Sequence, residues 1–348
     1  MKKISTILFV MMCIYSQAQQ AYYDNIDFNL RGIALKQELA DLITSTHNRT
    51  LSYRQVWDAL KKTDIDPNDP SKVIQLYGYN RTSSTGNDAY YNNTSNNGGG
   101  TNQWNREHTY AKSLGTPNLG ESGPGADAHH LRPTNVQRNS NRGNLKFIDG
   151  SGNSQKISNG WYPGDEWKGD VARMMMYMYV RYDNRCNPAN VGFGSTANTP
   201  DNMIDLFLEW NAEDPVSAIE IQRNEYLGNS NNPYAQGNRN PFIDNPYLAT
   251  LIWGGAPAEN KWQSLSTVNY IQKDKSYKTY TTSNSAFIIN DKKTVKEVTV
   301  YNSFGQIIQS IKNTLSTNPI EIKVNQKGTY ILMINGNDFN ATEKVLIK

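Results

Sequence analysis

The chain has few cysteines and few histidines, and its hydrophobic runs are short. It contains two cysteines and four histidines in 348 residues. Cys13 lies in an N-terminal apolar stretch, so only Cys186 would remain after cleavage of that stretch, and no intrachain disulfide could form. The core or a bound metal must then stabilise the mature chain. With 37% hydrophobic and 11% aromatic residues, the composition excludes a disordered, fibrous or multi-spanning membrane protein.

The first residues contain the three parts of a secretory signal peptide. Lys2 and Lys3 precede an apolar stretch over 7–14, and a small-x-small site follows at 16–18. The stretch is too short to cross a bilayer. We therefore expect residues 1–18 to be removed, a secreted or cell-surface protein, and no membrane span in the mature chain. The alternative is a buried N-terminal helix.

Arginine is absent after Arg239, and this absence marks a change in charge. Residues 270–348 contain 11 Lys and 6 acidic residues, a charge of +5, whereas residues 19–269 carry −4. The overall charge of +3 therefore comes from the two ends of the chain. An anionic partner of the middle region would need a local cationic patch.

Hydrophobic spacing predicts mostly helical structure before about residue 255. We expect helices over 33–43, 53–60 and 170–182, and we interpret the methionine run in the last as core. Asp214 as cap and Pro215 at the first helical position predict another helix, which Gly228 ends. Residues 81–101 are rich in Ser, Thr, Asn and Gly, which predicts a mobile surface loop.

After about residue 265 the apolar period changes to two. Alternating segments over 298–301 and 306–309, and over 320–324 and 329–333, flank turn residues and predict two hairpins. The sequence thus predicts a catalytic domain over 19–260, a linker over 261–275 and a small all-β sandwich over 276–348.

The residues that can carry chemistry gather between 104 and 147. This stretch holds three of the four histidines, and its charged residues sum to +3: Arg106, Lys112, Arg132, Arg138, Arg142, Lys146, Glu107, Glu121 and Asp127. A capping box predicts a short helix from Thr134 to Arg142 that stops at Gly143. On this helix Arg138 and Arg142 share one face. Asn135 and Asn139 share the neighbouring face. Amide and carboxylate oxygens suit a hard cation such as Mg²⁺, and guanidinium groups suit phosphate.

Glu107 and His108 are adjacent. In a regular strand they would point to opposite faces, so both serve one site only where the strand ends or bulges. A histidine with an ordinary pKa near 6.5 suits a general base, and Glu107 suits a metal ligand. The adjacency alone is more typical of a structural histidine than of a catalytic one.

Three segments together resemble the secreted bacterial endonuclease I family, of the ββα-metal (His-Me finger) class. They cover residues 105–113, which contain Asn105-Arg106-Glu107-His108, then 127–144 and 210–244. The resemblance spans about residues 25–255. It implies an α+β fold with a ββα-metal core embedded in a mostly helical domain. It also implies a metal-dependent, non-sequence-specific endonuclease that hydrolyses DNA, with RNA as a further substrate.

The resemblance also implies roles for single residues. His108 would be the general base, and Glu107 and Asn139 would hold one divalent metal, Mg²⁺ with Mn²⁺ or Ca²⁺ as alternatives; products would carry 5′-phosphates. His129 would be structural and His130 solvent-facing. Some family members have an Arg between the first two motifs that contacts the scissile phosphate. Residues 109–131 contain no Arg, which leaves three candidates for a catalytic phosphate contact: Arg132, Arg138 and Arg142.

The C-terminal region is similar to the sorting domains of type IX secretion in Bacteroidetes. The similarity rests on 298–302, 327–332 and the ending 343–348, and it implies the secretion machinery as a partner. The alternative is a carbohydrate-binding or adhesive β-sandwich. We expect a monomer.

Two other functions stay open at this point. One is a zinc hydrolase that uses Asp127, His129, His130 and His108; the other is a non-enzymatic surface adhesin. The sequence does not distinguish DNA from RNA, single from double strands, one divalent metal from another, or a released protein from a surface-attached one.

Overall fold

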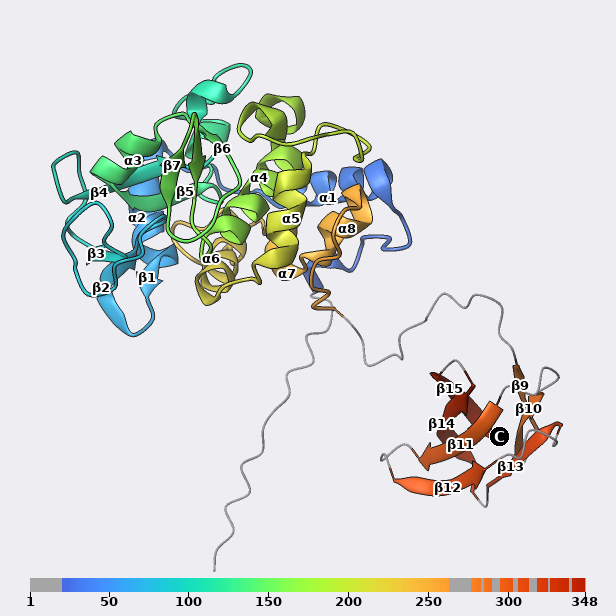
Figure 1. The fold of residues 1–348 in the computed structure, drawn as a ribbon. Coiled ribbons are helices and arrows are strands. Elements are labelled where there is room, and N and C mark those ends of the chain that lie inside the picture. Colours follow the sequence, from blue (N-terminus) through green and yellow to red (C-terminus); the bar gives the residue numbers. More distant parts are fainter. Residues whose placement is uncertain are drawn as a thin grey trace, which may run out of the picture. The chain divides into compact units, whose positions relative to one another are not determined.

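The computed structural model describes residues 21–262, 277–282, 285–289, 295–302, 306–312, 318–324, 326–337 and 340–347. They belong to two compact units, divided between residues 262 and 263 (Figure 1). The predicted signal peptide, and the predicted linker beyond Trp262, lie outside the described residues. Among the described helices, none has the length and apolar character that a membrane span requires.

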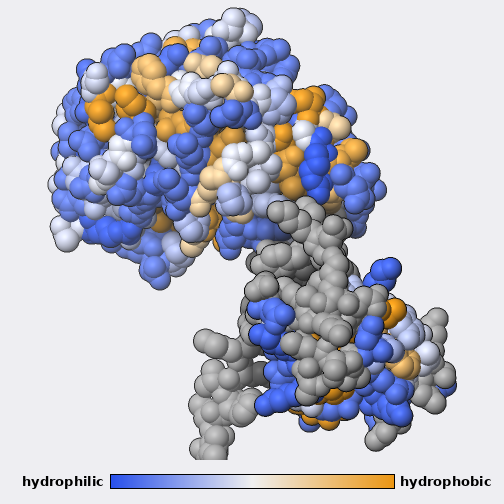
Figure 2. Space-filling model, turned by 45° about the vertical axis from the view of Figure 1, so that its right-hand side comes forward, coloured by the Kyte–Doolittle hydropathy of each residue, from blue (hydrophilic) through white to orange (hydrophobic). Residues whose placement is uncertain are grey.

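The first unit mixes helices with short strands. Its helices are α1 (Gly32–Ser45), α2 (Tyr53–Thr63), α3 (Val136–Arg142), α4 (Lys168–Tyr182), α5 (Asp205–Glu213), α6 (Ala218–Gly228), α7 (Pro241–Asp244) and α8 (Tyr247–Trp253). Its strands are β1 (Ile65–Asp66), β2 (Asp69–Ile74), β3 (Tyr91–Asn93), β4 (Trp104–His108), β5 (Leu131–Asn135), β6 (Lys146–Phe147), β7 (Gln155–Ile157) and β8 (Gly160–Tyr162). The helices predicted over 33–43, 53–60 and 170–182 are confirmed. The face shown in Figure 2 is mostly hydrophilic, with small groups of hydrophobic side chains.

Helix α4 runs through the main core of this unit and contacts α1, α5 and α7. Its four methionines are each at most 3% exposed: Met174, Met175, Met176 and Met178. Their interpretation as core is therefore confirmed. In Figure 1, α1, α4, α5 and α8 gather on one side of the unit, and β1–β4 with α2 on the other.

Strands β4 and β5 and helix α3 form a strand–strand–helix unit. The strands pair antiparallel, from Trp104 opposite Asn135 to His108 opposite Leu131. Helix α3 follows β5 directly and contacts both strands. Its cap is Asn135, whose side chain accepts hydrogen bonds from the next turn, while Thr134 lies in β5. The capping box predicted at Thr134 is therefore wrong, because the asparagine one residue later takes the cap; the predicted stop at Gly143, whose φ is 54°, is confirmed.

The helix start predicted at Asp214 and Pro215 is also wrong. Asp214 is the C-cap of α5, and its Oδ2 accepts a hydrogen bond from Gly169 N at 2.8 Å. Helix α6 begins at Ala218, where Ser217 and Glu220 form a capping box. The Asp214 carboxylate thus caps α4 rather than a helix of its own; the predicted end of α6 at Gly228 is confirmed.

The segment 81–101 contains regular structure. Within it β3 pairs antiparallel with β2. Asn92 is 2% exposed, and its side-chain amide donates to Asn102 O at 2.9 Å. The prediction of a surface loop is therefore wrong for this part, since a strand and a buried amide tie it to the unit.

The C-terminal unit is all-β. Its strands are β9 (Lys278–Thr281), β10 (Ser285–Ile289), β11 (Val295–Asn302), β12 (Ile307–Lys312), β13 (Ile320–Lys323), β14 (Gly328–Gly336) and β15 (Asn340–Ile347). They form two antiparallel sheets, in the orders β13-β10-β9 and β12-β11-β14-β15, which share one core. The first predicted hairpin is confirmed as β11–β12. The second is wrong, because β13 pairs with β10 and β14 with β11.

Candidate active site

His108 is the last residue of β4 and is 9% exposed. Its Nε2 lies 2.9 Å from Gly125 O, in the short 3₁₀ helix Gly123–Ala126. A carbonyl only accepts, so Nε2 carries the proton and donates it, which leaves the lone pair on Nδ1. Burial, followed by the nearby His130, lowers the pKa of His108 to about 3. The ring is therefore neutral near pH 7, with the Nδ1 lone pair unprotonated.

Aromatic side chains fix the plane of this ring. Tyr53, the first residue of α2, stacks on it with centroids 5.5 Å apart and planes at 29°. His130 packs against it at 5.6 Å. The guanidinium of Arg106 lies 3.5 Å from the centroid of the Tyr53 ring. Arg106 and His108 are two residues apart on β4 and so point to the same face.

Glu107 points to the opposite face of β4 and is 2% exposed. Tyr77 Oη donates to its Oε1 at 3.1 Å, and Arg142 Nη1 lies 3.3 Å from the same oxygen. Burial raises the pKa of Glu107 to about 7, although Arg142 and the Tyr77 hydroxyl oppose the rise. A divalent cation nearby would stabilise the charged carboxylate in this environment.

Asn139 comes to the same side of β4 from helix α3. Its Nδ2 donates to Asn105 Oδ1 at 2.7 Å. The contact between Asn139 and Asn105 and the contact between Arg142 and Glu107 both join helix α3 to strand β4. Asn139 and Arg142 are three residues apart on α3, and Asn105 and Glu107 are two apart on β4. The structure therefore brings Asn139 and Glu107 to one interface. His108, which shares no polar contact with Glu107 among the described residues, ends the strand beside it.

The donor set of this interface suits a hard cation. It offers the Glu107 carboxylate and the Asn139 amide oxygen, which accepts no hydrogen bond within the part of the chain that the structure describes. Oxygen donors of this kind are what Mg²⁺, Mn²⁺ and Ca²⁺ prefer. Across the described residues, no three His, Cys, Asp or Glu side chains are grouped to hold a metal, so water or substrate oxygens would complete the shell.

The three arginines proposed as phosphate contacts are all buried. Arg132 is 1% exposed; its Nε lies 2.6 Å from Asp64 Oδ1 and its Nη1 2.9 Å from Asp170 Oδ2. Arg142 is also 1% exposed, and besides Glu107 it donates to the carbonyls of His108 and Thr109. These contacts point to structural roles for both.

Arg138 has a similar environment. It is 7% exposed, and it donates from Nε to Asn87 O at 2.8 Å and from Nη1 to Ser154 O at 3.0 Å. Its guanidinium therefore ties two loops to helix α3.

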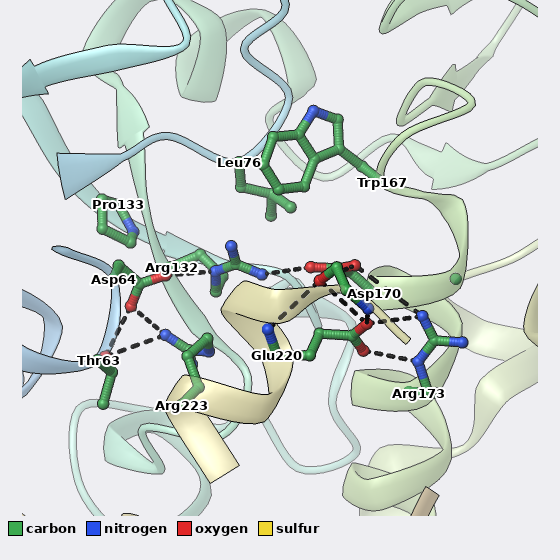
Figure 3. A network of polar contacts seen from close by, with 12 residues as sticks. Thr63, Asp64, Leu76, Arg132, Pro133, Trp167, Asp170, Arg173, Glu220 and Arg223 are labelled. Carbon is green, nitrogen blue, oxygen red and sulfur yellow. Dashed lines mark hydrogen bonds and ion pairs between the residues drawn. The ribbon is translucent and has the colours of Figure 1, made fainter. Parts of the chain in front are cut away.

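Arg132 belongs to a buried chain of ion pairs (Figure 3). Asp64 also pairs with Arg223 from α6, and Arg173 of α4 pairs with Glu220 at 2.6 Å. Every side chain in these pairs is at most 4% exposed. The chain links β5, which is paired with β4, to helices α4 and α6. It fixes the strands that carry the site.

The two adjacent histidines have backbone partners. His129 Nε2 lies 3.0 Å from Asn238 O, and His130 Nε2 lies 2.8 Å from Pro124 O. His130 is fully buried, so the expectation of a solvent-facing side chain is wrong. The carboxylate of Asp127 accepts from Tyr177 Oη at 2.8 Å and from Gln236 Nε2 at 3.0 Å. These contacts hold the loop beneath His108.

Sequence reasoning missed three contributors to the site. Tyr53 reads as an ordinary helix residue, Tyr77 as a core aromatic and Gly125 as part of a turn. Each acts through a contact between segments far apart in the chain, and no local motif signals such a contact.

Comparison with known proteins gives consistent matches. A family model described as Endonuclease I matches residues 31–247, and one described as a secretion system C-terminal sorting domain matches residues 282–348. Two similar proteins carry the name "Extracellular ribonuclease". The one from Bacillus amyloliquefaciens is 43% identical over 233 residues, 64% of this chain and 74% of the relative. The one from Bacillus subtilis (strain 168) is 41% identical over 243 residues, 67% of this chain and 78% of the relative.

Proposed function

Because this chain belongs to the endonuclease I family and ends in a secretion sorting domain, we propose which reaction this secreted nuclease performs and with which residues. It hydrolyses phosphodiester bonds in RNA and in DNA, without sequence preference and with one divalent metal. The name of the two relatives supports RNA as a substrate. If water is the attacking group, cleavage does not need the 2′-hydroxyl of RNA as a nucleophile. DNA, which lacks this hydroxyl, would then be a substrate as well.

One observation carries the proposal, namely the fixed tautomer of His108. With Nε2 bound to Gly125 O at 2.9 Å, the free lone pair is on Nδ1, and Tyr53 holds the ring plane. A neutral, oriented imidazole can take a proton from a water molecule as that water attacks phosphorus. The products would then carry 5′-phosphates.

Glu107 and Asn139 would hold the metal between β4 and α3. The bound ion would stabilise negative charge on the scissile phosphate and on the departing oxygen. We therefore interpret β4, β5 and α3 as a ββα-metal core. Arg142 and Tyr77 both contact Oε1 of Glu107 and would keep the carboxylate in place.

Digestion of plasmid DNA and of RNA tests this proposal. The full chain is assayed with Mg²⁺, Mn²⁺ or Ca²⁺ and with EDTA, next to His108→Ala and Asn139→Ala. We expect cleavage of both polymers with a divalent ion, loss in EDTA, and a loss of roughly 10²–10⁴-fold in His108→Ala, the usual contribution of a general base. Full activity of His108→Ala would remove the base assignment.

The chemistry of the product ends separates water from an internal nucleophile. Attack by the 2′-hydroxyl gives cyclic phosphates and 5′-hydroxyl ends, and it fails on 2′-O-methyl RNA. We expect 5′-phosphate ends and cleavage of 2′-O-methyl RNA. Cyclic phosphate products would contradict the proposed mechanism. Neither the zinc hydrolase nor the adhesin has a specific observation in its favour.

A further inference from the structure

Arg106 is the arginine beside His108 whose guanidinium has most of its hydrogen-bond donors free. We propose that Arg106, packed against the rings of Tyr53 and Trp57, binds a backbone phosphate of the substrate next to His108. The inference rests on the proposed nuclease function and names the contact that positions the substrate in that site.

The first argument is burial. The three arginines favoured by sequence, Arg132, Arg138 and Arg142, are 1%, 7% and 1% exposed. All three donate to carboxylates or to backbone carbonyls. Arg106 is only half-buried, so a ligand can reach it.

The second argument is the free edge of the guanidinium. Of its N–H groups, only those on Nη1 have an acceptor among the described residues, the Tyr53 carbonyl. Nε is buried without a hydrogen-bond partner and faces no open space, whereas Nη2 makes no hydrogen bond within the described residues. Nη2, together with the second N–H of Nη1, is therefore the end of the guanidinium that can donate to phosphate oxygens.

The third argument is preorganisation. The guanidinium carbon lies 3.5 Å from the Tyr53 ring centroid and 4.3 Å from that of Trp57. Stacking on aromatic faces holds an arginine in one conformation while its edge stays available. Less side-chain entropy is then lost when a phosphate binds.

The fourth argument is position. Tyr53 contacts both Arg106 and His108, and these two residues point to the same face of β4. Lys112 Nζ lies 5.9 Å from the Tyr53 ring and pairs with Glu121 at 3.1 Å. Two cations and one exposed carboxylate thus surround the ring that supports the base, which favours an anion at this place.

Salt-dependent binding tests the inference in the full chain carrying His108→Ala. The affinity for a labelled single-stranded RNA is measured by fluorescence anisotropy over about 50 to 200 mM salt. For Arg106→Gln we expect binding to weaken roughly tenfold or more, as for a lost hydrogen bond to a charged group. The slope of log K against log salt should become shallower by about 0.7, the value for one contact to a single strand.

Two further variants complete the design. Arg31→Ala removes the same charge at the start of α1, on the other side of the unit (Figure 1), and should change neither affinity nor slope. Arg106→Lys keeps the charge but loses the planar edge, so it should keep the slope and bind more weakly. If Arg106→Gln does not fold, the test rests on Arg106→Lys. An affinity of Arg106→Lys equal to that of the chain with Arg106 unsubstituted then overturns the inference.

Cleavage assays with His108 left unsubstituted separate this inference from the proposed function. We expect Arg106→Gln to raise KM more than it lowers kcat. If the unsubstituted chain cleaves neither RNA nor DNA, the proposed function fails. If it cleaves both, and Arg106→Gln retains its KM and salt slope, then only the inference about Arg106 is overturned.

Discussion

The ring of Tyr53 lies against the ring of His108, with centroids 5.5 Å apart and planes at 29°. Tyr53 begins helix α2 and His108 ends strand β4, so this contact joins His108 to a helix about fifty residues earlier in the sequence. We predict that Tyr53→Ala lowers kcat by roughly tenfold to hundredfold, because a small displacement of a catalytic group has effects of this size. Tyr53→Phe keeps the ring and should retain nearly full kcat; equal activity of both variants would contradict a positioning role.

The carbonyl of Gly125 is the second element that orients His108. A Cβ atom at this position would lie 2.0 Å from Gly120 O, so Gly125→Ala must displace the loop and the acceptor of the His108 proton. We predict a fall in kcat with little change in KM. Gly99→Ala is the matched control, since a Cβ there meets nothing within 4 Å. Wild-type kcat in Gly125→Ala would show that this acceptor is dispensable.

Divalent ions should stabilise the folded chain. An ion that binds only the native state adds about 2.7 kcal/mol at one hundred times its Kd. We predict that Mg²⁺ or Mn²⁺ raises the melting temperature of the wild type, and that Glu107→Gln abolishes most of this rise. Glu213→Gln changes an exposed carboxylate paired with Lys168 and should leave the rise intact. The readout does not depend on activity, and an equal rise in Glu107→Gln would argue against Glu107 as a ligand.

The buried ion pairs predict a stability effect. Arg132→Met leaves the carboxylates of Asp64 and Asp170 without their shared partner, and losing one member of a buried pair typically costs about 3–5 kcal/mol. Urea unfolding should show the loss. Lys72→Ala breaks the exposed pair with Asp69 and should not move the midpoint. An unchanged midpoint in Arg132→Met would mean that the network does not stabilise the fold.

Two buried histidines predict loss of stability in acid. Burial lowers the pKa of His129 and of His130 to about 4, although Asp127 opposes this shift. Below about pH 6.5 the unfolded chain therefore binds protons that the folded chain does not. Their stabilising effect is complete above that pH and falls by about 1.4 kcal/mol per histidine per pH unit as the pH decreases toward 4.

Thermal unfolding between pH 7 and pH 5 checks this expectation. The melting temperature should fall with pH in the wild type. In His129→Gln, which retains a hydrogen-bond donor but does not titrate, the fall should be smaller. A fall in His129→Gln as large as that of the wild type would rule the mechanism out, whereas the wild-type value alone also contains the opposite contribution of Glu107, whose pKa is raised to about 7.

Much of the fold follows from local pattern. The periodicity of 33–43 and of 170–182 predicts α1 and α4, and the change of period after 265 predicts the β unit. The failures come from contacts across the fold. Aspartate is a residue type typical of helix N-caps, but the Asp214 carboxylate accepts a hydrogen bond from Gly169 N on helix α4. Strand β13 is followed in sequence by β14, which the sequence predicts as its hairpin partner, yet β13 pairs with β10.

The roles of Glu107, His108 and Asn139 stay predictions from the sequence motif. The structure brings Asn139 and Glu107 to one interface and places His108 at the end of the same strand. The sequence does not tell which arginines are buried, because burial depends on where distant carboxylates such as Asp64 and Asp170 lie in the fold. Arg106 has no sequence signal that separates it from the other arginines. Its packing against the rings of Tyr53 and Trp57 does separate it.

The contact between Arg142 and Glu107, at 3.3 Å, has a consequence for the life of an exported enzyme. A built-in cation lies beside the carboxylate, so the polypeptide can reach its native fold without a metal. Under the proposed metal dependence, loading would be a late step, governed by the ions of the surroundings. Chelation would then switch the enzyme off reversibly, with the scaffold left intact for reactivation.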